Sequence, residues 1–198
     1  GITTLAEAQS VRVYADSAKT TEWAREIVTL TEMHVKVPSL TSTVEMYVDW
    51  DGVRADYAVT DTYGRNNVWT GYVAVWHAGE ASGDLLSSTG NNTGVDTNTV
   101  GSAAGKIGNG RNFVRSSSEY FSIASGSQTG LGITGNAITM SCWVKGDATL
   151  NNAVGRIFWR LGGTGSYGYQ LSTSGNSYTP NNAYAISAVG TGGGFDFA

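Results

Sequence analysis

The chain has 198 residues, enough to bury a hydrophobic core but too few for two large domains. Glycine accounts for 27 of them, twice its usual share of about 7%, and this disfavours a helical bundle because glycine weakens helix interiors. Charged residues make up only 14% and the net charge is −4, so we expect no nucleic-acid partner. No apolar segment approaches the roughly 20 residues of a membrane-spanning helix, so we expect no membrane insertion.

Alternating apolar and polar residues in the first fifty positions predict β-strands. The shorter signals are residues 11–14 and 33–37, and the clearest is residues 44–50, where every second side chain from Val44 to Trp50 is apolar and is expected to face the core. Residues 20–30 contain β-branched residues after a few helix formers, and we interpret them as a turn and a strand. Turn-forming pairs in residues 51–71 predict a long connecting loop.

A second strand-rich block begins at residue 73. Its apolar segments are short and are separated by clusters of Gly, Ser, Asn and Thr, which is typical of an antiparallel sandwich or barrel. Cys142 falls on the apolar face of the best alternating segment, so we expect a buried, inert thiol. The predicted strands are residues 73–77, 112–114, 120–123, 138–145, 156–161, 167–171 and 184–189.

Five ordered motifs of this block carry a resemblance to a known family. They are residues 73–80, 87–94, 105–113, 117–123 and 138–145. Together they resemble the opening half of the concanavalin A-like, laminin G-like jelly-roll domains of bacterial and phage surface proteins. Residues 10–14, 34–40 and 63–69 resemble the small β-domain of unknown function that commonly precedes such jelly rolls.

The resemblance implies two domains. Residues 1–71 correspond to the C-terminal part of the small β-domain and a connector, and residues 72–198 to the N-terminal part of an all-β, antiparallel jelly-roll sandwich. Both ends look clipped relative to the family pattern. We therefore expect either a longer polypeptide or a sheet that strands of another chain complete.

Residues that could support catalysis are few. A glycoside hydrolase needs two facing carboxylates, and the nearest set, Glu45 with Asp49 and Asp51, is interpreted as solvent-facing charge. The only histidines, His34 and His77, are more than forty residues apart and, with one cysteine, do not supply zinc-ligand spacing. We therefore predict no enzyme activity, no catalytic residues and no metal site.

Two kinds of ligand remain to be considered. Laminin G-like domains sometimes hold calcium through oxygen ligands, which Asp, Asn and backbone carbonyls supply, but the same residues stabilise tight turns and we adopt that interpretation, with no cofactor. The candidates for calcium are Asp84, Asn91, Asn92 and Asp96. Glycan binding would use aromatic platforms beside amide and hydroxyl donors. The aromatic candidates are Trp143, Trp159, Tyr167, Tyr169, Tyr178 and Tyr184.

The family resemblance leads to the predicted function. We expect a non-enzymatic module for adhesion or for recognition of a glycan or surface polysaccharide, located outside the cell, on a cell surface or on a virion. The alternative is a structural decoration, fibre or filament subunit that contacts neighbouring subunits and binds no small ligand. A hydrolase using Glu45 or Asp49 is the third hypothesis.

Overall fold

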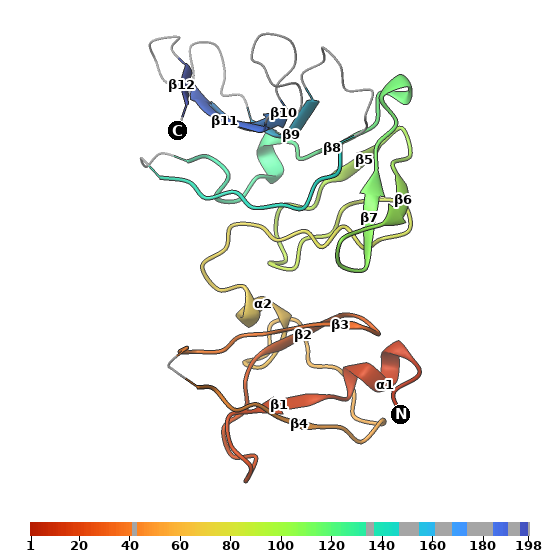
Figure 1. The fold of residues 1–198 in the computed structure, drawn as a ribbon, viewed down its shortest axis with the longest axis vertical. Coiled ribbons are helices and arrows are strands. Elements are labelled where there is room, and N and C mark those ends of the chain that lie inside the picture. The colour runs from red at the N-terminus through yellow and green to blue at the C-terminus, as the bar shows by residue number, and fades with distance from the viewer. Residues whose placement is uncertain are drawn as a thin grey trace. The chain divides into compact units, whose positions relative to one another are not determined.

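A computed structural model of the chain describes residues 1–40, 43–133, 137–146, 155–160, 168–173, 184–189 and 195–197. Contacts between residues divide the chain into two compact units, Gly1–Asn136 and Ala137–Ala198, whose elements are labelled in Figure 1. The domain boundary predicted between residues 71 and 72 lies inside the first unit, and it stays a prediction.

The described residues form small antiparallel sheets with almost no helix, which confirms the β-rich class. Their strands do not form a sandwich or a jelly roll within the described part of the chain. Where the structure is described, no helix is long and apolar enough to cross a membrane.

The first unit begins with helix α1 (Leu5–Gln9), which the strand-based analysis missed. The Thr4 hydroxyl accepts from the Glu7 N–H at 3.2 Å, and the Glu7 carboxylate accepts from the Thr4 N–H at 2.9 Å. This reciprocal capping box satisfies two amide groups at the start of the helix. Hydrogen bonds from Thr3 and Thr4 lower the pKa of Glu7 to about 2. The Thr-x-x-Glu pattern was therefore a usable sequence signal for this helix.

Strand β1 (Arg12–Tyr14) has neighbours on both sides. It pairs antiparallel with β4 (Tyr47–Asp49), and on its other side the Trp23 N–H donates to the Val13 carbonyl at 2.8 Å. Val13 is fully buried and forms a core cluster with Val11 and Trp23. Strands β2 (Arg25–Thr29) and β3 (Glu32–Val35) form an antiparallel hairpin. These three strands confirm the predictions at residues 11–14, 20–30 and 33–37.

The prediction that residues 44–50 bury their apolar face is only partly confirmed, because Val44 packs against the core cluster but the other three apolar side chains are exposed. Only the three residues of β4 pair as a strand, and Met46, Val48 and Trp50 are 49%, 52% and 41% exposed. Asp49 instead forms an ion pair with Arg54 at 2.7 Å. Alternation groups the apolar side chains on one face, but burial also requires another element over that face, and β4 pairs with β1 alone.

The rest of the first unit consists of a short helix and two strand pairs. Helix α2 (Arg65–Val68) follows Gly64, where a Cβ atom would lie 2.2 Å from the Ala58 carbonyl oxygen, so only glycine fits. Beyond it, β5 (Val95–Thr97) pairs with β8 (Tyr120–Ser122), and β6 (Gly101–Ala104) pairs with β7 (Asn109–Asn112). Single 3-10 turns occupy η1 (Arg115–Ser117) and η2 (Ser125–Ser127).

Strand β8 confirms the prediction at residues 120–123, whereas the other predictions in this region are only partly met. Of the strand predicted at residues 112–114, only Asn112 belongs to a strand, because β7 ends there. Residues 73–77 contribute one isolated bridge, from Trp76 to Ser87, in place of a strand. Strands β5 and β6 were not predicted.

The second unit contains one four-stranded antiparallel sheet in the order β12-β11-β10-β9. Its strands are β9 (Gly155–Arg160), β10 (Gly168–Thr173), β11 (Tyr184–Val189) and β12 (Phe195–Phe197). The first three confirm the predictions at residues 156–161, 167–171 and 184–189, and β12 was not predicted. Residues 138–145, predicted as a strand, form no ladder with the described residues.

Candidate functional site

Glu26, on β2, is a buried carboxylate at the centre of a polar network in the first unit. Only 5% of the residue is exposed. Its oxygens accept hydrogen bonds from Trp69 Nε1 at 2.5 Å, from Ser88 Oγ at 2.6 Å and from His77 Nε2 at 3.0 Å. The three donors are all more than forty positions away in the sequence. The network therefore joins β2 to residues 69–88, across the predicted domain boundary.

These donors also determine the charge of Glu26. Its burial alone would raise the pKa of the carboxyl, but hydrogen bonds from His77, Ser88 and Trp69 outweigh burial and the pKa lies below its ordinary value. Glu26 is therefore a carboxylate at neutral pH, and it holds the three donors in fixed positions.

The two histidines of the chain lie against each other beside Glu26. The rings of His34 and His77 stack with their centroids 4.7 Å apart and their planes at 27°. Glu32 Oε1 lies 2.9 Å from His34 Nε2 and 3.7 Å from His77 Nδ1. We expected the separation of His34 and His77 along the chain to keep them from sharing a site. That expectation is wrong, because the fold brings the two rings into contact.

The carboxylates considered for hydrolysis make local contacts. Glu45 accepts a hydrogen bond from the Tyr47 hydroxyl at 2.6 Å. Asp51 accepts from the backbone N–H of Arg54 at 2.9 Å and so stabilises a turn, while Asp49 pairs with the Arg54 guanidinium. Each contact accounts for its carboxylate by a structural role.

The loop residues considered for calcium form hydrogen bonds to distant segments of the chain. Asn92 is buried, and its amide donates to the Val73 and Thr129 carbonyls at 3.0 Å and 2.8 Å. The Asp84 carboxylate accepts the Asp96 N–H at 2.9 Å. These bonds join residues 12 to 37 positions apart, so they are tertiary contacts, and the turn interpretation stays a prediction; Asn91 is exposed beside Asn92.

Among the aromatic candidates for glycan binding, Trp159 lies on an exposed part of β9. The residue is 50% exposed, and the guanidinium carbon of Arg156 lies 4.5 Å from the centroid of the indole ring. Gln170 on β10 is the direct cross-strand partner of Trp159, so the two side chains project from the same face of the sheet. An aromatic ring, a guanidinium and an amide thus meet on one surface.

The other aromatic candidates differ in their surroundings. Trp143 is strongly exposed, whereas Tyr169 is half-buried, and burial raises the pKa of its hydroxyl. Tyr167, Tyr178 and the side chain of Tyr184 lie outside the part of the chain that the structure describes.

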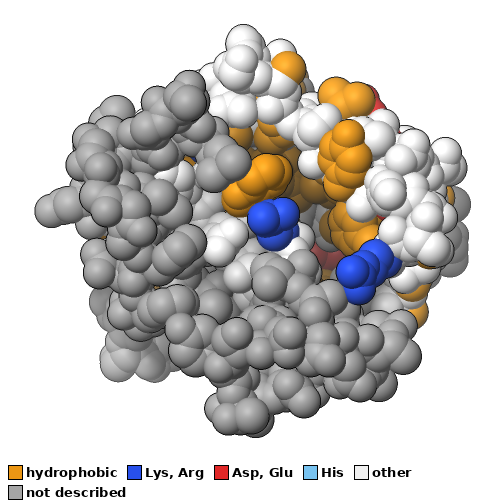
Figure 2. Space-filling view, turned by 90° about the horizontal axis from the view of Figure 1, so that it is seen from above, with side chains coloured by type: hydrophobic (Ala, Val, Ile, Leu, Met, Phe, Trp, Pro, Cys, Tyr) orange, Lys and Arg blue, Asp and Glu red, His pale blue; other side chains and the backbone are white. Residues whose placement is uncertain are grey.

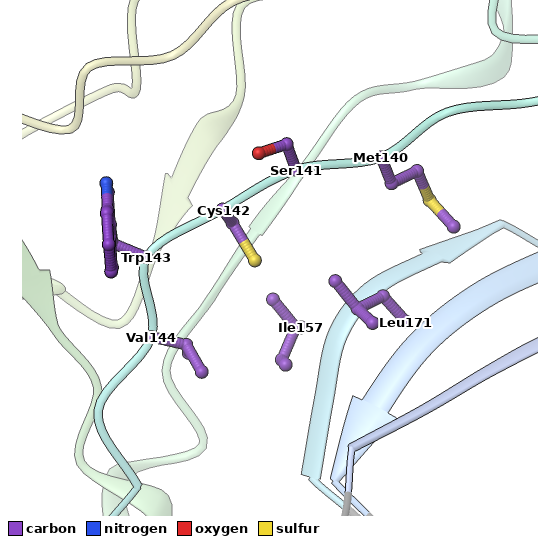
Figure 3. A pocket seen from close by; sticks show the side chains of 7 residues that line it. All are labelled: Met140, Ser141, Cys142, Trp143, Val144, Ile157 and Leu171. Carbon is purple, nitrogen blue, oxygen red and sulfur yellow. The ribbon is translucent and has the colours of Figure 1, made fainter.

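Cys142 lines a pocket of about 390 Å³ in the second unit (Figure 3). The lining residues are Met140, Ser141, Cys142, Trp143, Val144, Ile157 and Leu171. In Figure 3 the Cys142 sulfur points toward Ile157 while Trp143 points away, so the predicted alternation of side chains is present without a strand. The predicted burial is wrong, because the pocket is open and Cys142 is exposed.

Partial burial nevertheless raises the pKa of the Cys142 thiol. Because only the thiolate is nucleophilic, we expect alkylation by iodoacetamide to reach half its maximal rate at a higher pH in the folded chain than in the chain unfolded by urea. Intact mass spectrometry over a pH series measures both profiles on the single cysteine. A folded-state midpoint at or below that of the unfolded chain would contradict the expectation.

No protein-family model, curated protein or solved structure matches this chain. The arrangement of its own side chains, together with the resemblance drawn from its motifs, is therefore the basis for a function.

Sequence reasoning missed Glu26, Glu32, Trp69 and Ser88. Part of the cluster had a local signal: Glu32 and His34 are two residues apart on one strand and so share a face. Glu26 is the direct cross-strand partner of His34. The β2–β3 hairpin alone thus groups three of these residues, whereas the arrival of His77 depends on tertiary contacts.

Proposed function

We propose that the chain is a non-enzymatic, sandwich-type β-module of a surface protein that recognises a glycan. The observation that carries the proposal is the surface on β9 and β10 formed by Trp159, Arg156 and Gln170. The motifs that resemble concanavalin A-like, laminin G-like jelly rolls support the same assignment and a location on a cell surface or virion.

The chemistry of this surface suits a sugar. The apolar C–H face of a pyranose packs on an exposed indole, and its hydroxyl groups accept from a guanidinium and exchange hydrogen bonds with an amide. Arg156 lies against the Trp159 ring and restrains it, which lowers the entropy lost on binding. Figure 2 shows hydrophobic side chains and Lys or Arg side chains next to each other on the described part of one face.

The test is binding of the intact chain to a glycan array that includes bacterial surface polysaccharides. We expect retention of at least one glycan class by the unmodified chain, and a loss of about 30-fold in affinity for Trp159→Ala, the effect of removing a central aromatic contact.

Trp50→Ala is the matched control, because Trp50 is also an exposed tryptophan but lies in the first unit. It should bind like the unmodified chain. Equal binding by Trp159→Ala and Trp50→Ala, or no retention by any glycan of a chain that circular dichroism shows to be folded, would refute the proposal.

A structural subunit is the second candidate, and the pocket beside Cys142 favours it. Four apolar side chains line it, Met140, Val144, Ile157 and Leu171, and accessible apolar side chains of this kind are what a strand from a neighbouring copy covers in an assembly. Sedimentation velocity of the same preparation separates the two. Concentration-dependent association without glycan binding would favour the subunit, and a monomer that binds glycan would favour the recognition module.

A further inference from the structure

Three potential metal ligands meet on Glu32, His34 and His77, whose ligand atoms lie within 4.8 Å of one another. Glu32 and His34 project from the same face of β3, and His77 comes from the segment after α2. We propose that these three side chains bind one zinc ion and that Glu26 is the positioning residue for His77. The site is separate from the proposed glycan surface, so either proposal can fail alone.

The distances around Glu32 Oε1 suit a zinc ion. Nitrogen and oxygen ligands in a tetrahedral zinc site lie about 3.3 Å apart, given metal–ligand bonds near 2.0 Å. Glu32 Oε1 is 2.9 Å from His34 Nε2 and 3.7 Å from His77 Nδ1. The ligand atoms of all three residues lie within 4.8 Å of one another, so rotation of the His34 and His77 side chains would bring the set to this spacing.

Glu26 supplies the outer contact that a metal-binding histidine requires. His77 Nε2 lies 3.0 Å from Glu26 Oε2, and a proton donated there leaves the lone pair of a neutral ring on Nδ1, the nitrogen that faces Glu32. Ligating histidines usually donate their second N–H to a carboxylate, a backbone carbonyl or water, which fixes the orientation of the ring. Ser88 and Trp69 in turn hold the Glu26 carboxylate, so two layers of contacts are already in place.

The charge of the cluster also favours a cation. Glu26 and Glu32 place one carboxylate at each ring nitrogen of His77. Both carboxylates attract a cation, and the cluster offers an oxygen and two nitrogens, the ligand types of zinc.

A bound zinc ion would connect the β2–β3 hairpin to the segment that carries His77. Three protein ligands leave a fourth position for water. Because the unfolded chain does not hold these side chains together, zinc would stabilise the folded first unit.

The experiment uses the full chain without a polyhistidine tag. The chain has two histidines and both belong to this cluster, so long-range ¹H–¹⁵N NMR spectra report on the site without overlap. When zinc chloride is titrated into metal-free chain, we expect the His77 Nδ1 and His34 Nε2 resonances to shift and to stop shifting at one equivalent. The midpoint of thermal unfolding should rise at the same time. Resonances that stay unmoved in a large excess of zinc would overturn the proposal.

Variants assign the roles of the residues. His77→Ala should lose saturation at one equivalent, and if it does not fold, His34→Ala makes the same test at a more exposed position. Glu26→Gln should weaken zinc binding about 10- to 100-fold, and without zinc it should move the His77 proton from Nε2 toward Nδ1. Glu45→Gln, at an exposed carboxylate, should bind zinc like the unmodified chain. Unchanged affinity in the histidine variants would reject the site.

Discussion

Replacing Arg25 by methionine is expected to destabilise the first unit strongly. The Arg25 side chain is 1% exposed, and it donates to the Val11 carbonyl at 2.8 Å and the Gln9 carbonyl at 2.7 Å, in addition to its ion pair with Asp56. Methionine fills the volume of the stem but makes none of these bonds. The Gln9 and Val11 carbonyls also accept from Arg12 Nη1 at 3.1 and 2.9 Å, so each keeps one donor. The loss is therefore that of three hydrogen bonds from a charged group, about 1 kcal/mol each, and we expect a total of about 3 kcal/mol.

Urea unfolding followed by tryptophan fluorescence measures this loss. Arg25→Lys should be intermediate, because a single ammonium keeps the charge but not the planar fork that reaches two carbonyls. Lys19→Met is the control: Lys19 pairs with Asp49 through an exposed side chain, and such a pair contributes below about 1 kcal/mol. If Arg25→Met and Lys19→Met have the same free energy of unfolding, the hydrogen bonds of the buried Arg25 guanidinium do not stabilise the fold.

Arg111→Met is also expected to destabilise the first unit strongly. Arg111 lies on β7, in the part of that unit that follows residue 71. The Arg111 side chain is 1% exposed. It donates to the Glu80, Gly83 and Val100 carbonyls at 3.1, 2.9 and 2.7 Å, so it fastens the loop at residues 80–83 to β7 and to the residue before β6. Loss of these three bonds should cost about 3–5 kcal/mol.

Hydrogen exchange read by mass spectrometry shows how far the effect of Arg111→Met extends. Because the Glu26 network joins β2 to His77 and Ser88, we expect faster exchange in peptides from residues 1–71 as well as from residues 72–133. The exposed Arg115→Met should change neither set. Faster exchange confined to residues 72–133 would mean that the first unit does not unfold cooperatively and would favour a domain boundary near residue 71.

Local sequence patterns were sufficient for many of the strands. Alternation and turn residues predicted β1, β2, β3, β8, β9, β10 and β11, because side-chain periodicity and glycine-rich turns are properties of neighbouring residues. The same patterns were insufficient for β4: Met46 and Val48 lie on a regular apolar face, yet nothing in their own segment determines whether another element covers it.

For the candidate sites as well, the sequence identified single residues and the structure identified their neighbours. Trp159 was identified from the sequence as an aromatic on a strand, and its exposure and its neighbours Arg156 and Gln170 came from the structure. His34 and His77 stand out in the sequence as well, but their separation along the chain gives no sign that they meet. The pairing of β2 with β3 and the contact of His77 with Glu26 bring them together.

By itself, the sequence determined that this protein is built from short strands and turns with few charged residues. Only the tertiary structure decided what those few charges do. Glu26, Arg25 and Arg111 are buried because partners distant in the chain satisfy them. No local pattern encodes such burial, since a charged residue enters a core only when the fold supplies the hydrogen bonds that replace water.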